Sequence, residues 1–127
     1  MRAHPHFDDR GTLDWHTRYD EALGRAKQEG KRVFIEMGRL QCSQCRSLVE
    51  SVVPGKAVAA LLREHFVALA SDADATEDAV VDLGMQNLPD AMMLPFVMFT
   101  DADGKFLDGS SGLVDPARFQ ATLERLI

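Results

Sequence analysis

Cysteine is scarce in this chain, which has only two cysteines among its 127 residues. One closely spaced pair excludes the disulfide framework of small secreted domains and instead indicates a metal-binding or catalytic pair. Long apolar runs are also absent, since no stretch approaches the roughly 18 residues that a membrane span needs. Basic residues are in deficit, with 14 Lys and Arg against 20 Asp and Glu, which argues against a nucleic-acid-binding protein. We therefore expect one well-solvated domain that is a monomer in solution, with a small oligomer as the alternative.

A secretory signal is also absent from the N-terminus, because residues 1–9 have no apolar core. This predicts a cytoplasmic protein if the chain is full length, and a periplasmic or secreted protein if a leader has been removed. Residues 1–13 show no periodicity and are interpreted as an N-terminal arm, followed by a folded domain over 14–127. Within the arm, His4-Pro5-His6 is more typical of a mobile tail than of a metal site.

Hydrophobic periodicity divides the rest of the chain into helices and strands. Apolar runs predict strands at 33–37, 66–70, 94–100 and 105–107, the last two joined by a hairpin turn. Helical spacing predicts helices over 17–29, 42–53, 57–64, 76–84 and 116–126. Thr17, Thr76 and Asp115 are the expected N-caps, and 109–112 is the expected flexible link. Helices between the early strands imply parallel pairing and the late hairpin adds antiparallel strands, so the fold class is an α/β sandwich with a mixed sheet.

The two cysteines, Cys42 and Cys45, follow the strand predicted at 33–37. If they open the next helix, both sulfurs lie on one face of its first turn, close enough to bond. Unpaired N–H groups and the positive end of the helix dipole favour a thiolate there, with Arg39 and Arg46 adding positive potential. Thiolates attack disulfides, so the pair predicts redox chemistry. Cys42 is expected to attack, because it is nearer the helix start and more exposed, and Cys45 to resolve the mixed disulfide.

A zinc site is a competing interpretation, because a Cys-x-x-Cys pair also begins zinc sites. A mononuclear site needs two further ligands, and none of the four histidines falls at a partner spacing: His4, His6, His16 and His65. A non-catalytic module that binds a partner or a metal is a further alternative. At the level of the residues these alternatives stay open.

Glu36 interrupts the apolar strand at 33–37. If that strand is central, a lone buried carboxylate favours its neutral form and is suited to exchange a proton with Cys45. The alternative is a carboxylate that faces solvent or pairs with a lysine at the end of the strand. Glu36 is therefore a candidate catalytic residue beside the two cysteines.

Other residues accompany the cysteine pair at characteristic distances. Glu36 lies six positions before Cys42, Leu94-Pro95 begins the strand before the final hairpin, and Gly112 precedes the last helix. With these features the chain resembles the thioredoxin superfamily over about residues 14–126. The resemblance is to its small thioredoxin-like disulfide reductases and isomerases.

The resemblance implies a thioredoxin-like three-layer α/β/α sandwich and a thiol:disulfide oxidoreductase. It implies a cis Leu94–Pro95 bond, beside which an extended substrate segment pairs as an added strand. The implied substrates are protein disulfides, and no cofactor is implied beyond the redox-active Cys42–Cys45 disulfide itself. An unidentified reductase or oxidase would recycle the pair.

Residues next to the cysteines are expected to contact the substrate: Gln41, Ser43 and Gln44. The family usually has Trp at the first of these positions, and Gly-Pro or Gly-His often stand between the cysteines. Because the intervening residues help to set the acidity of the first thiol, the direction of the reaction stays open. Four methionines are interpreted as core filling and loop packing rather than as a soft substrate surface: Met85, Met92, Met93 and Met98.

Overall fold

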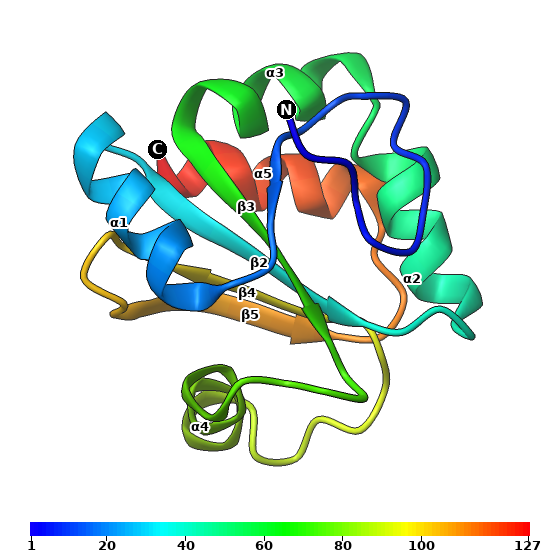
Figure 1. The fold of residues 1–127 in the computed structure, drawn as a ribbon. Helices are drawn as coiled ribbons and strands as arrows, with labels where there is room; N and C mark the ends of the chain where they lie inside the picture. Colours follow the sequence, from blue (N-terminus) through cyan, green and yellow to red (C-terminus); the bar gives the residue numbers. More distant parts are fainter.

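The computed structural model describes residues 1–127, which fold around one five-stranded sheet (Figure 1). The strands are β1 (Trp15–His16), β2 (Arg32–Gly38), β3 (Phe66–Asp72), β4 (Phe96–Thr100) and β5 (Phe106–Ser111). The helices are α1 (Tyr19–Glu29), α2 (Ser43–Ser47), the π-helical turn η1 (Leu48–Val52), α3 (Lys56–His65), α4 (Asp78–Asn87) and α5 (Pro116–Leu126). None of these helices combines the length and the apolar character needed to cross a membrane.

β2 lies at the centre of the sheet, whose strand order is β1-β3-β2-β4-β5. It pairs in parallel with β3, which also pairs in parallel with β1. On its other side β2 pairs antiparallel with β4, and β4 pairs antiparallel with β5. Parallel pairing of β2 and β3 is possible because helical segments connect them, whereas a short turn suffices between β4 and β5. The predicted mixed sheet in an α/β sandwich is confirmed.

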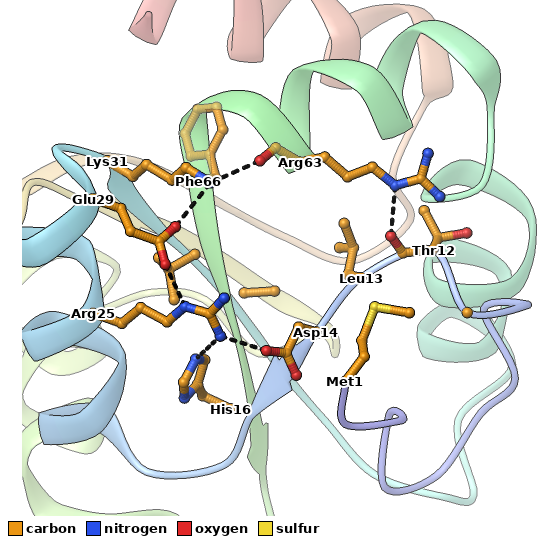
Figure 2. Close-up of a pocket in the computed structure, with 13 residues that line it drawn as sticks. Met1, Thr12, Leu13, Asp14, His16, Arg25, Glu29, Lys31, Arg63 and Phe66 are labelled. Carbon is orange, nitrogen blue, oxygen red and sulfur yellow. Dashed lines mark hydrogen bonds and ion pairs between the residues drawn. The ribbon is translucent and has the colours of Figure 1, made fainter.

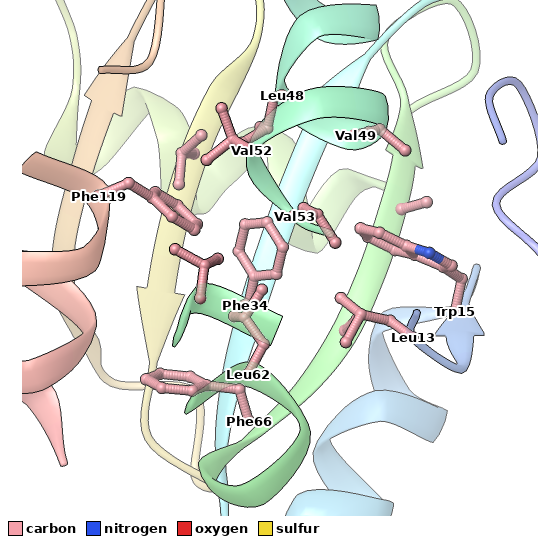
Figure 3. Packing of buried hydrophobic residues seen from close by; sticks show 14 of the residues in the cluster. Leu13, Trp15, Phe34, Leu48, Val49, Val52, Val53, Leu62, Phe66 and Phe119 are labelled. Atoms are coloured by element: carbon pink, nitrogen blue, oxygen red, sulfur yellow. The ribbon is translucent and has the colours of Figure 1, made fainter. Parts of the chain in front are cut away.

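Alternation along β2 sends its side chains into two separate cores. Phe34 packs with residues of η1, α3 and α5, while Val33 and Ile35 pack with residues of α1 and α4. Figure 1 shows α3 and α5 on one side of the sheet and α4 on the other. In the larger core the ring centres of Phe34 and Phe119 are 5.6 Å apart (Figure 3). Each such buried aromatic ring contributes roughly 2–3 kcal/mol.

Two predicted helix caps are wrong. α1 begins at Tyr19 and takes no cap from Thr17. Its first N–H group donates instead to Oε1 of Glu77 at 2.8 Å, across 58 positions of sequence. α4 begins after Glu77 and has no side-chain cap, because the Thr76 hydroxyl donates to the carbonyl of Asp72 at 2.8 Å instead of accepting from the helix. Both differences arise from partners outside the helix concerned.

Three other boundaries differ from the prediction. β1 is an edge strand of two residues, too short to carry a periodic pattern. β5 continues through Ser111, so the flexible link expected at 109–112 is wrong except at Gly112, whose φ of 90° favours glycine. α4 passes Gly84 and ends at Asn87, whose side chain donates to a carbonyl one turn earlier.

The N-terminal arm, residues 1–13, packs against the rest of the chain. His4 is only 6% exposed, and its ring lies edge-on against Trp15 with ring centres 4.7 Å apart. The buried carboxylate of Asp9 accepts hydrogen bonds from the Trp15 indole N–H at 2.8 Å and from the Leu13 N–H at 3.0 Å. The mobile tail predicted at His4-Pro5-His6 is therefore wrong, because these contacts join the arm to the core.

Charged side chains also hold the arm, beside a hollow of about 280 Å³ (Figure 2). Asp14 accepts hydrogen bonds from the backbone N–H of Arg2 at 2.6 Å and from the guanidinium of Arg25. Burial opposes ionisation, but the hydrogen bonds from Arg2 and Arg25 hold the pKa of Asp14 far below its ordinary value. Nε2 of His16 faces the Arg2 guanidinium at 3.1 Å. Burial, together with the charges of Arg2 and Arg25, lowers the pKa of His16.

Candidate functional site

The two cysteines lie just beyond the C-terminal end of the central strand β2. Cys42 is half-buried and is the N-cap of α2, whereas Cys45, one turn later, is 0% exposed. A disulfide joins them, with their Cα atoms 5.2 Å apart. One sulfur is therefore near the surface and the other faces the core. An incoming disulfide would meet Cys42 first.

Backbone hydrogen bonds place the Cys42 sulfur at the start of the helix. The Cys45 N–H donates to Sγ of Cys42 at 3.1 Å, and the Arg46 N–H donates to the Cys42 carbonyl at 3.0 Å. A hydrogen bond to sulfur strengthens when the sulfur is ionised, so the Cys45 N–H favours a Cys42 thiolate once the disulfide opens. The helix continues into η1, and π-helical turns are frequent at functional sites.

Two arginines that were expected to add positive potential are both ion-paired. Arg39 lies 2.6 Å from Asp74, and Arg46 lies 3.2 Å from Glu50. The Arg46 guanidinium also covers the Phe7 ring, 5.0 Å from its centre. Pairing reduces the potential that either arginine contributes at the cysteines. The start of the helix is therefore the main local source of positive potential.

Glu36 faces the cysteines because it lies two residues after Phe34 on the same face of β2. Glu36 is 1% exposed, and its Oε2 atom has no hydrogen-bond partner. A methyl group added to Gly38 would clash with this Oε2 atom and would lie 2.7 Å from Sγ of Cys45. The carboxylate oxygen and the sulfur therefore meet over the backbone of Gly38. The predicted burial of Glu36 is confirmed, and the solvent-facing and lysine-paired alternatives are excluded.

The second oxygen of Glu36 is bound by a residue that sequence reasoning assigned to a mobile tail. Nε2 of His4 lies 2.7 Å from Oε1 of Glu36, and both side chains are almost completely buried. Nδ1 of the same ring accepts from the backbone N–H groups of His6 at 3.0 Å and Phe7 at 3.2 Å. An accepting Nδ1 carries no proton, so Nε2 carries it and donates to Glu36. In the sequence, the only indication of this hydrogen bond is that Glu36, if buried, needs a partner. Nothing in the spacing of the residues identifies His4 as that partner.

The peptide bond between Leu94 and Pro95 is cis, as predicted. The Pro95 carbonyl accepts from the Gly112 N–H at 3.0 Å. The N–H and carbonyl of Met93 bind the Ser111 hydroxyl at 3.1 and 2.5 Å. Between these groups, neither the N–H nor the carbonyl of Leu94 has a hydrogen-bond partner within the chain. One backbone donor and one backbone acceptor beside the cis bond are therefore without a partner in the chain.

The three residues beside the cysteines that are predicted to contact the substrate take different positions. Gln41 and Ser43 are exposed. Gln44 turns inward, and its buried Oε1 atom has no donor. A methyl group on Gly112 would lie 3.9 Å from that oxygen. Gln44 at the start of α2 therefore lies beside the segment that follows β5, without a hydrogen bond to it.

Exposed apolar side chains lie near the cis bond. Met92 is 88% exposed, Met93 is 59% exposed and Leu113 is 71% exposed. Met98 on β4 is fully buried, whereas Met85 is also exposed. Of the predicted core filling and loop packing, core filling is confirmed for Met98 and wrong for the other three methionines, because the segment before β4 and the end of α4 lie at the surface.

The histidines, considered above as zinc ligands, have separate partners and do not form a cluster. His6 lies 3.7 Å from Asp72, and His65 lies 3.8 Å from Glu64. His4 and His16 have the partners described above. No group of three or more His, Cys, Asp or Glu side chains is arranged to hold a metal ion.

The chain is similar in sequence to known proteins. The family described as thioredoxin-like matches residues 14–102. The chain is 27% identical over 92 residues to spermatogenesis-associated protein 20 of Rattus norvegicus, a match that covers 72% of this chain and 10% of that protein. The chain therefore corresponds to about a tenth of the length of this relative.

Solved structures show the likeness of fold. A thioredoxin from Thermus thermophilus superposes with a TM-score of 0.72 at 22% identity, covering 91% of this chain and 87% of that chain. A disulphide isomerase from Xylella fastidiosa Temecula1 superposes with a TM-score of 0.64 at 20% identity, covering 84% of this chain and 86% of that chain.

Proposed function

Because the chain belongs to the thioredoxin-like family, we propose that it is a thiol:disulfide oxidoreductase that works through Cys42 and Cys45. The observation that carries the proposal is the asymmetry of the pair, with one half-buried sulfur at a helix start and one buried sulfur beside a carboxylate. A purely structural role explains this disulfide poorly, because a bridge stabilises less as the loop that it closes becomes shorter.

In the reducing direction, the Cys42 thiolate attacks one sulfur of a substrate disulfide. A bond forms between Cys42 and that sulfur, the substrate S–S bond breaks, and the first substrate thiolate leaves with the electron pair. Cys45 then attacks the Cys42 sulfur, the Cys42–Cys45 bond forms, and the second substrate thiolate leaves. Two electrons have passed from the dithiol to the substrate. The same steps in reverse donate a disulfide, and a partner reductase or oxidase restores the starting state.

Glu36 is proposed to take the proton of Cys45 in the second step. Cys45 is buried, so its thiol has no direct route to bulk water. Support for this role comes from the unpartnered Oε2 of Glu36, which lies on the same side of Gly38 as the Cys45 sulfur. In the reverse direction the protonated carboxyl returns it to the Cys45 thiolate.

Protein disulfides are the proposed substrates. The free N–H and carbonyl of Leu94 suit an extended peptide segment that pairs as a short added strand. Such pairing uses hydrogen bonds to the substrate backbone, so it tolerates varied side chains in the substrate. Met92, Met93 and Leu113 provide exposed apolar surface for those side chains, and methionine adapts well to varied partners.

The test is reduction of insulin by dithiothreitol, followed as precipitation of the released chain. We expect the wild-type protein to accelerate the reaction and the Cys42→Ser variant to be inactive. Ser51→Ala is the matched control, because Ser51 is exposed on the same helical segment. An inactive wild-type protein that binds metal would favour the non-catalytic module. If the wild-type protein is active, equilibration of the cysteine pair with glutathione gives its reduction potential and the favoured direction of disulfide exchange.

A further inference from the structure

The carboxylate of Glu36 has two different environments, one for each oxygen. Oε1 accepts the Nε2–H of His4 at 2.7 Å, while Oε2 has no partner and shares the space over Gly38 with Sγ of Cys45. His4 reaches this position from the N-terminal arm, 32 positions before Glu36. The arm therefore supplies the only side-chain hydrogen bond made by the carboxylate beside the cysteines.

The His4 ring is held on several sides. Its Nδ1 atom accepts two backbone N–H groups of the arm, from His6 and Phe7. Its ring stacks on Phe7 with centres 5.5 Å apart and meets Trp15 edge-on with centres 4.7 Å apart. A rotated ring would lose these contacts, so the Nε2–H group points at Glu36 in a fixed direction. A donor held in this way orients the carboxylate plane as well.

We propose that His4 is the positioning residue for the resolving step, so that the N-terminal arm forms part of the redox site. Its hydrogen bond to Oε1 fixes the plane of the carboxylate and so holds Oε2 of Glu36 toward Cys45. Without this bond Glu36 would be a buried carboxylate with no partner, free to turn about its last side-chain torsion. The inference rests on the proposed function, since it assigns a role within that reaction.

The step that His4 supports is closure of the Cys42–Cys45 bond. The Cys45 S–H proton passes to Oε2 of Glu36 as the Cys45 sulfur attacks Cys42. The bond from Cys42 to the substrate sulfur breaks, and the substrate leaves as a thiolate with the electron pair. His4 keeps its own proton throughout and donates the same hydrogen bond before and after the transfer. The attack of Cys42 on the substrate does not use this proton and should not depend on His4.

Stopped-flow mixing of the reduced protein with dithiobis-nitrobenzoate, whose thiol product is coloured, separates the two attacks. Attack by Cys42 releases the first coloured thiol at a rate that depends on protein concentration. Attack by Cys45 on the mixed disulfide releases the second at a rate that does not. Two variants separate the two hydrogen-bonding functions of the His4 ring. His4→Asn keeps an acceptor for the N–H groups of the arm, but its side chain is too short to reach Glu36. His4→Gln keeps a donor at the position of Nε2.

We expect His4→Asn to slow the second phase about tenfold and to leave the first phase unchanged, while His4→Gln stays within about threefold of the wild type. Glu36→Gln should slow the second phase about 100-fold. In that background His4→Asn should have no further effect, because no carboxylate remains to be positioned. His6→Asn is the matched control, since the His6 side chain lies near Asp72 rather than Glu36.

Three results would overturn the inference. Equal second-phase rates in the wild type and His4→Asn would remove the role of His4 and leave the proposed function in place. An equal slowing in His4→Asn and His4→Gln would show that the ring acts by packing alone. A wild-type protein that shows neither phase and does not reduce insulin would refute the proposed function, and the inference with it.

Discussion

Gly38→Ala tests whether the space over Gly38 is needed by the carboxylate and the sulfur that meet there. The backbone of Gly38 is outside the left-handed region, so alanine is compatible with its conformation. The added methyl group, however, would lie 2.7 Å from Sγ and 3.1 Å from Cβ of Cys45, and would clash with Oε2 of Glu36. Neither neighbour can move aside freely, because Cys45 is in a disulfide and Glu36 is bound by His4.

The magnitude follows from two opposing effects. Replacing glycine by alanine restricts the unfolded chain and by itself stabilises a protein by about 0.4–1 kcal/mol. Overpacking a well-filled core costs about 1–3 kcal/mol. Since the neighbours are fixed, the cost should exceed the gain, and we expect Gly38→Ala to lower the free energy of unfolding by about 1–2 kcal/mol. That loss corresponds to a decrease of roughly 0.5–1 M in the urea midpoint.

The assay is urea unfolding of the oxidised protein, followed by tryptophan fluorescence. Gly24→Ala is the matched control, because Gly24 lies exposed in α1 and a methyl group there would meet no atom within 4 Å. This control should gain about 0.5–1 kcal/mol from helix propensity. If Gly38→Ala were as stable as the wild type while Gly24→Ala was stabilised, the space over Gly38 would not be tightly filled. The geometry assigned to Glu36 and Cys45 would then be wrong.

Three further perturbations probe the N-terminal arm. Asp9→Ala should lower the free energy of unfolding by about 2–3 kcal/mol, measured by urea unfolding, because it leaves the buried Trp15 indole N–H without its acceptor. Asp14→Asn should lower the free energy of unfolding near neutral pH by weakening the bond to Arg2. The fold lowers the pKa of Asp14, so the difference in unfolding free energy between the wild type and the variant should shrink as the pH falls below the ordinary value of 3.8. A difference that is equal at neutral pH and below pH 3.8 would contradict this assignment. The fold also lowers the pKa of His16, so unfolding free energy should decrease as the pH falls below 6.5, where the unfolded state gains a proton, and His16→Gln should flatten that part of the profile.

Features that depend on neighbouring residues were predictable from the sequence. The apolar run at 33–37 identifies the central strand, and its period of two places Glu36 on the same face as Phe34. The Cys42–Cys45 spacing places both sulfurs in the first turn of a helix. α5 is likewise local, since Asp115 caps it by accepting from an N–H three residues later, at 3.0 Å. In each case the backbone period or the reach of one side chain determines the structure.

Other features exist only because folding brings distant segments together. The bond between His4 and Glu36 spans 32 positions, and the bond that caps α1 with Glu77 spans 58. No periodicity links such pairs, and their residue types are common in solvated segments. The amino-acid sequence by itself determined that Glu36 shares a face of β2 with Phe34, because alternation along a strand is a property of its backbone. The tertiary structure decided which group would satisfy that carboxylate, because a buried charge takes whichever donor the packing of the chain carries to it.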